Sequence, residues 1–252
     1  MTAGGATSPG TSSDAAPAFV EPAASVRWGM GDAFAGLLLS LLLSLLVSSL
    51  VLRLVGEQDF GDLPLWTTAL LQVPLWVALL GVPLVATRLK GRRSLRTDFG
   101  FAMRWTDIPI GLGLGLALQL ALGILVQLLY PLLGLDLDRV GDSAEELTAD
   151  ATNGLGVALV ILIAAVGAPL FEELFYRGLF LRSVQRRFGD ATAVVAPALI
   201  FGLVHFQLFD LPALVLFGVA MGVVTLRVGR LGVAIWAHVA FNLTALLSLL
   251  YA

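Results

Sequence analysis

Two acidic residues and one arginine interrupt a long apolar stretch in the second half of this chain. Glu172, Glu173 and Arg177 lie within six residues of one another, and most of their neighbours from Ala168 to Phe180 are apolar. A charged side chain at the centre of a membrane helix costs about 2.5–3.5 kcal/mol on insertion scales. A soluble helix with a surface ion pair needs a polar face, and the flanking residues are apolar on every face. We therefore expect the three charges to serve a function inside a membrane.

The chain contains two histidines, and each lies in a further apolar stretch. Residues four apart share one face of a helix, so we expect Phe201 beside His205 and Asn242 beside His238. At a rise of about 1.5 Å per residue, Glu172, both histidines and Asn242 lie roughly 12–21 Å from the basic end of their spans. We expect these side chains to meet around one polar pocket at middle depth.

Such a pocket has the groups needed to hydrolyse a bond with an activated water. A carboxylate and an imidazole, here Glu172 and His205, can together hold and deprotonate a water molecule. An imidazole and an amide on one helix face, here His238 and Asn242, offer two hydrogen-bond donors to an oxyanion. No serine or cysteine stands beside either histidine as a nucleophile. Either histidine taken alone could equally be a buried core residue, and only the combination favours function.

The remaining residues near these motifs are expected to support the pocket. Glu173 and Arg177 are four apart and can form an intrahelical ion pair. Glu172 lies about 100° round the helix from Glu173 and can face a different partner. Phe201 is expected to pack against its neighbours.

The composition places all of this in a membrane protein. The 252 residues are 58% hydrophobic and 13% charged, whereas soluble domains are about 25% charged. The apolar residues form runs long enough to cross a bilayer, which predicts an all-α, polytopic helical bundle. The absence of cysteine excludes disulfides and cysteine-ligated metals. The sequence has no basic surface of the kind that nucleic acid requires.

We expect about seven transmembrane helices after a disordered tail at residues 1–30. Residues 31–152 then hold the first three spans, and residues 153–252 hold the candidate site. The fifth and sixth spans are short and could be re-entrant or partial. The expected spans are roughly 33–54, 63–87, 108–130, 153–181, 191–207, 211–226 and 231–250.

The loop charges predict the orientation of the bundle. Basic residues gather in the loops after the second, fourth and sixth spans, and acidic residues after the first and third. Lysine and arginine favour the cytoplasmic side of a membrane. We therefore expect the N-terminus in the cytoplasm and the C-terminus outside.

Three short motifs occur in order within about residues 153–247. They consist of Glu172, Glu173 and Arg177, then Phe201 and His205, then His238 and Asn242. Together they resemble the motifs of the CPBP family, which contains type II CAAX prenyl proteases, bacteriocin-processing proteins and abortive-infection proteins. The resemblance implies an intramembrane endopeptidase of the plasma membrane, with a site open to the cytoplasm. The implied substrate is a membrane-associated or lipidated, CAAX-like protein or peptide.

The resemblance also assigns roles to the motif residues. Glu172 and His205 would activate the water, while His238 and Asn242 would stabilise the oxyanion. Glu173, Arg177 and Phe201 would support the site. Members of the family have been described both as metalloproteases and as metal-independent glutamate proteases. Glu172, His205 and His238 could make a minimal zinc site, but the His-Glu-x-x-His spacing is missing, so we favour a site without metal.

Two other functional classes remain open at this point. A proton-coupled transporter also places glutamate, histidine and asparagine at the bilayer midplane, but it predicts inverted repeats that the two halves do not show. A non-catalytic immunity or scaffold protein would use the same fold to bind a partner without cleaving it.

Overall fold

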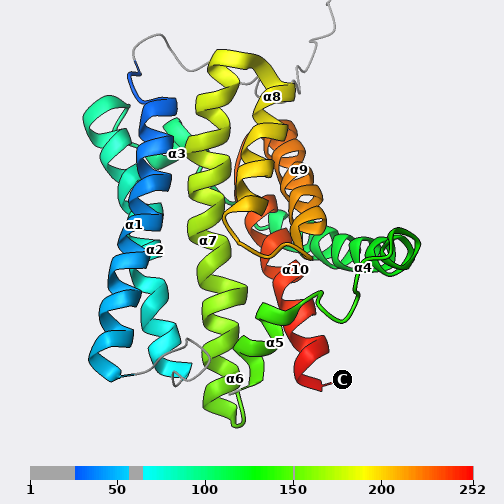
Figure 1. Cartoon of the computed structure of the whole chain (residues 1–252). Coiled ribbons are helices and arrows are strands. Elements are labelled where there is room, and N and C mark those ends of the chain that lie inside the picture. Colours follow the sequence, from blue (N-terminus) through cyan, green and yellow to red (C-terminus); the bar gives the residue numbers. More distant parts are fainter. Residues whose placement is uncertain (1–25, 57–64, 150, 252) are drawn as a thin grey trace, which may run out of the picture.

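The computed structural model describes residues 26–56, 65–149 and 151–251, and within these ranges the chain forms helices, turns and loops but no strand. Six of its helices are long and apolar enough to cross a membrane (Figure 1). The prediction of an all-α, multi-pass membrane protein is therefore confirmed. The predicted disordered tail lies outside the described residues up to position 25. Residues 26–30 of the predicted tail are described, and among them Val26 and Trp28 are buried.

The first two helices form an antiparallel pair at one side of the bundle (Figure 1). Helix α1 (Met30–Val55) ends at Gly56, whose φ of +80° glycine adopts without strain. Helix α2 (Leu65–Lys90) contains two internal prolines and stays helical, which membrane helices tolerate when neighbours satisfy the freed carbonyls. The short helix α3 (Leu95–Phe99) follows.

One long helix forms the centre of the molecule (Figure 1). Helices α6 (Gly154–Val160), α7 (Ala168–Glu172) and the first part of α8 (Leu181–Leu203) follow one another along it. Two π-helical segments join them, at Ile161–Gly167 and Glu173–Phe180. The two π segments flank Pro169 and Glu172, and the second begins at Glu173. Segments of π-helix are frequent at functional sites.

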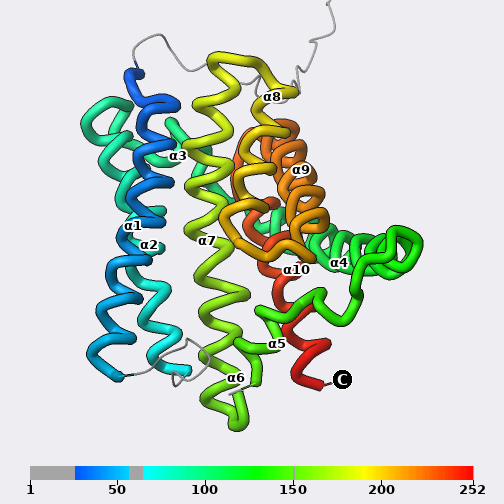
Figure 2. The backbone as a smooth tube through the Cα atoms, viewed as in Figure 1, coloured from blue at the N-terminus to red at the C-terminus, as the bar shows by residue number. Residues whose placement is uncertain are grey.

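The long helix reverses at Gly189, where φ is +79° and ψ is −180°. Glycine permits this conformation because it has no Cβ. The chain then runs back beside itself through the second part of α8, as Figure 2 shows. That returning limb has about 14 residues, fewer than the roughly 20 that cross a bilayer. The predicted total of about seven spans is therefore not confirmed, because six candidate spans are found and one of them is folded back.

Helices α4 (Asp107–Leu133) and α10 (Gly232–Tyr251) cross at very close range. A Cβ on Gly111 would lie 2.5 Å from the Cβ of Trp236, and a Cβ on Gly115 would overlap the carbonyl oxygen of Ala237. The two glycines, four residues apart, therefore serve helix packing. Helix α9 (Leu211–Val228) packs against α8, and the short helix α5 (Asp142–Ala149) connects α4 to the long helix.

The predicted basic loops meet at one end of the bundle. Arg186 donates a hydrogen bond to the carbonyl oxygen of Trp28 at 2.8 Å, and Lys90 pairs with Asp32 at 2.6 Å. Arg230 pairs with Asp107 at 2.5 Å, which ties the end of α9 to the start of α4. The basic loops therefore lie at the same end of the bundle. That this end faces the cytoplasm stays a prediction.

Candidate active site

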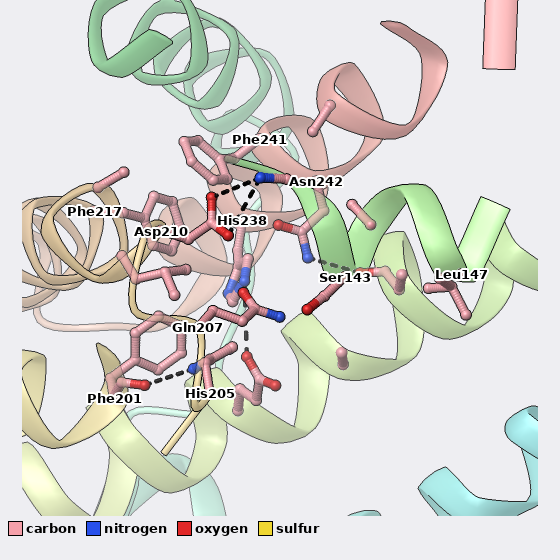
Figure 3. A pocket seen from close by; sticks show the side chains of 18 of the residues that line it. Ser143, Leu147, Phe201, His205, Gln207, Asp210, Phe217, His238, Phe241 and Asn242 are labelled. Carbon is pink, nitrogen blue, oxygen red and sulfur yellow. Dashed lines mark hydrogen bonds and ion pairs between the residues drawn. The ribbon is translucent and has the colours of Figure 1, made fainter. Parts of the chain in front are cut away.

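The candidate residues from three separate motifs line one cavity of about 1070 Å³. Figure 3 shows His205, His238 and Asn242 converging on its interior from different elements. The structure thus brings together the four side chains that the sequence analysis placed around one pocket. The motif residues on its wall are Glu172, Phe201, His205, His238 and Asn242.

Glu173 and Arg177 form the buried ion pair expected from their spacing. Arg177 donates to Oε1 of Glu173 at 2.9 Å, and the two side chains are 2% and 0% exposed. The same oxygen lies 2.8 Å from Nδ1 of His238. Arg177 also stacks over the ring of Phe201 at 4.6 Å and donates to the carbonyl oxygen of Gly218. Glu173 therefore connects the long helix to α10 by holding the imidazole.

His238 lies between the two glutamates. Its Nδ1 faces the Glu173 carboxylate, an acceptor, so the geometry assigns the Nδ1 proton to that hydrogen bond. Its Nε2 lies 3.8 Å from Oε2 of Glu172. We expected Glu172 to face a different partner from Glu173, yet both carboxylates reach the same ring. The two carboxylates can share one partner because the ring presents a different nitrogen to each of them.

His205 lies just beyond the end of α8 rather than inside it. The predicted helix 191–207 is wrong in this detail, because the helix ends at Leu203 and Phe206 has a φ of +56°. Nδ1 of His205 lies 2.5 Å from the carbonyl oxygen of Phe201, and the two rings are 4.6 Å apart. This contact fixes the ring and leaves Nε2 for the cavity. Among the described residues, no hydrogen bond or ion pair joins His205 to Glu172.

Asn242 donates from Nδ2 to the carbonyl oxygen of Ala164 at 2.7 Å. This carbonyl lacks a helical partner for two reasons. The N–H of Ala168 donates to Ile163 in the π register. Residue 169 is a proline, which has no N–H to donate. Sequence reasoning missed this bond, although a proline five residues after Ala164 is the signal that could have predicted a free carbonyl.

The loop that carries His205 is fixed from the far side of the cavity. Asp210 accepts a hydrogen bond from the N–H of Gly141 at 3.2 Å, and the Tyr130 hydroxyl donates to the carbonyl oxygen of Phe209 at 2.5 Å. Asp210 and Gln207 both line the cavity (Figure 3). The sequence analysis did not assign either residue to the site.

The three side chains named for a possible zinc site do not form a ligand cluster. Within the described residues, no three His, Asp or Glu side chains are grouped so that they could hold a metal ion. The expectation of a site without metal stays a prediction, and we route no chemical step through one.

Comparison with known proteins identifies the segment that carries these motifs. Residues 154–244 match the family model of the type II CAAX prenyl endopeptidase Rce1-like proteins. This segment is therefore similar to the Rce1-like family. The matched residues include all three motifs, so the resemblance to the CPBP family is confirmed.

The chain is also similar to the Bacillus subtilis (strain 168) protein named "Putative membrane peptidase YdiL". The two are 24% identical over 191 residues, which is 74% of this chain and 74% of that protein. No solved structure matches the chain. The Rce1-like match supports a protease, and together with the apolar helices it indicates a multi-pass membrane protein.

Proposed function

We propose that this protein is an intramembrane endopeptidase that hydrolyses a peptide bond of a membrane-associated or lipidated, CAAX-like protein or peptide. The observation that carries the proposal is the convergence of Glu172, His205 and His238 on one cavity between membrane helices. The Rce1-like match and the similarity to YdiL support the same class of reaction.

In the proposed reaction, Glu172 and His205 hold a water molecule in the cavity. Glu172 takes a proton as the water oxygen attacks the carbonyl carbon of the substrate, and it later returns that proton to the leaving amine. The negative charge that forms on the carbonyl oxygen requires donors. A neutral His238 uses its one proton on Glu173, so it donates from Nε2 only when both ring nitrogens carry protons.

Asn242 can supply the second donor while it keeps its bond to Ala164. A primary amide nitrogen carries two hydrogens, and one of them is used at the Ala164 carbonyl. The other is available to the oxyanion. Glu173 and Arg177 hold His238 in place through the buried ion pair, in the way that a carboxylate orients the histidine of a catalytic triad.

Comparative membrane proteomics tests the proposal. Wild-type cells and cells with Glu172→Gln are compared for proteins or peptides that accumulate uncut in the variant, and Glu146→Gln, an exposed glutamate on α5, is the matched control. We expect the same accumulating species for Glu172→Gln and His205→Ala and none for the control. A scaffold protein would give identical profiles for all four strains, which would refute the proposal.

We further propose that the basic end of the bundle faces the cytoplasm of a cell whose plasma membrane holds the protein. The excess of arginine at this end supports that orientation. The chain has no cysteine, so single cysteines can report topology without background. Arg187→Cys should react with an impermeant maleimide only after the cells are opened, and Glu146→Cys should react in intact cells. The reverse pattern would overturn the orientation.

A further inference from the structure

Four glutamines line the candidate active-site cavity. Gln72 comes from α2, Gln119 and Gln127 come from α4, and Gln207 comes from the loop after α8. The described residues contain five glutamines, and only Gln185 lies away from the cavity, where it donates to Asp190 at 2.9 Å. The glutamines of the membrane helices are therefore concentrated on the wall of a single space.

None of these four carboxamides is used to hold the protein together. Glutamine in a membrane helix ordinarily forms hydrogen bonds across to a neighbouring helix. Within the described ranges, no such bond is formed by Gln72, Gln119, Gln127 or Gln207, whereas the Asn242 amide is bonded to Ala164. Polar side chains at membrane depth are costly and mark functional pathways. The four carboxamides are thus available to a molecule that enters the cavity.

The chemistry of the wall fits a peptide backbone. A carboxamide offers two donor hydrogens and one acceptor oxygen, which complement the N–H and C=O of a peptide group without any net charge. The rest of the wall includes leucines of α1 and α2, such as Leu37, Leu75 and Leu79, which suit apolar side chains.

The spacing on α4 fits an extended peptide. Gln119 and Gln127 are eight residues apart, which is about 12 Å along a helix. An extended chain rises about 3.3 Å per residue, so four of its residues cover about 13 Å. Four is an even number, and peptide residues that far apart present their side chains to the same face. The two glutamines can therefore contact one edge of a single extended segment.

We propose that the cavity binds the substrate as an extended peptide whose backbone amides are hydrogen-bonded by Gln119 and Gln127, with Gln72 and Gln207 completing the polar wall. This inference rests on the proposed endopeptidase function and adds its mode of substrate recognition. A segment that is helical in the bilayer uses its own N–H groups internally, so the substrate must be unwound where it enters. Gln72, Gln119 and Gln127 lie outside the Rce1-like match at 154–244, so this recognition belongs to the N-terminal helices of this chain.

Peptide binding to the full chain tests the inference. The probe is a fluorescently labelled octapeptide of alternating alanine and leucine, compared with the same peptide N-methylated at alternate residues. Binding is measured by fluorescence anisotropy to the full-length Glu172→Gln variant in lipid nanodiscs, so that cleavage does not interfere. A net hydrogen bond is worth about 1 kcal/mol, and 1.4 kcal/mol is tenfold in affinity. We expect N-methylation to weaken binding roughly 5-fold or more, and Gln119→Leu or Gln127→Leu to weaken the parent peptide by a similar factor.

The ratio of the affinities for the unmethylated and the N-methylated peptide separates backbone recognition from a general loss of affinity. In Gln119→Leu the preference for the unmethylated peptide should fall, whereas Gln185→Leu, the control outside the cavity, should keep the full preference. Equal binding of both peptides to the parent protein, no binding of either, or an unchanged ratio in both α4 variants would overturn the inference. Because binding is read without cleavage, amide-dependent binding by Glu172→Gln together with no cleavage by the wild type would refute the proposed hydrolysis and leave this recognition standing.

Discussion

The buried ion pair beneath the candidate site predicts a large loss of stability when Arg177 is replaced by methionine. The side chains of Arg177 and Glu173 are 2% and 0% exposed. Removing one partner of a buried pair leaves an uncompensated charge and costs about 3–5 kcal/mol. His238 still contacts Glu173 in the variant, so we expect the lower part of that range. The matched control is Arg139→Met, whose ion pair with Asp142 is 58% and 45% exposed and worth about 0–1 kcal/mol.

The assay is reversible unfolding in mixed micelles, followed by circular dichroism as the denaturing detergent is increased. Arg177→Met should lower the free energy of unfolding by roughly 3 kcal/mol, and Arg139→Met by less than about 1 kcal/mol. Adding Glu173→Gln to Arg177→Met should recover part of the loss, because the double variant no longer buries an unpaired carboxylate. If Arg177→Met costs no more than Arg139→Met, the pair does not stabilise the site as the structure indicates.

Two further predictions concern the packing that positions the site. Gly115→Ala should destabilise the protein by about 1–3 kcal/mol in the same unfolding assay, because its Cβ would overlap the α10 backbone. A Cβ at Gly113 meets open space, so Gly113→Ala should be neutral or stabilising. Equal changes in the free energy of unfolding would contradict the close crossing of α4 and α10. Asn242→Leu should cost about 1–3 kcal/mol, because it leaves the Ala164 carbonyl unsatisfied. The destabilisation by Asn242→Leu should be smaller in a Pro169→Ala background, because residue 169 then has an N–H that can donate to the Ala164 carbonyl. An equal destabilisation in both backgrounds would show that the unsatisfied carbonyl is not its cause.

Much of the site could be predicted from residue types and spacing. Charges inside apolar runs are rare enough to be informative, so Glu172 and Arg177 were found without a structure. The i and i+4 spacing predicted the Glu173–Arg177 pair and the packing of Phe201 against His205, and the structure confirms both contacts. These predictions depend only on local helix geometry and the cost of burying charge.

The features that sequence reasoning missed depend on a chain reversal and on contacts between distant parts of the chain. His238 presents Nε2 to Glu172 and Nδ1 to Glu173, so one imidazole contacts both carboxylates although they lie about 100° apart on the helix. The reversal at Gly189 folded one predicted pair of spans into a continuous hairpin. The cavity glutamines could not be predicted as a group, because they lie on α2, α4 and the His205 loop, which are distant in the sequence and adjacent only in the fold.

The most direct test of the proposed hydrolysis is cleavage by the purified protein. Wild type, Glu172→Gln and Glu146→Gln are reconstituted in liposomes with a substrate that the membrane proteomics identifies, and new peptide termini are followed by mass spectrometry. We predict cleavage at one bond by wild type and Glu146→Gln and none by Glu172→Gln. Cleavage by Glu172→Gln at the wild-type rate would contradict the proposed role of Glu172.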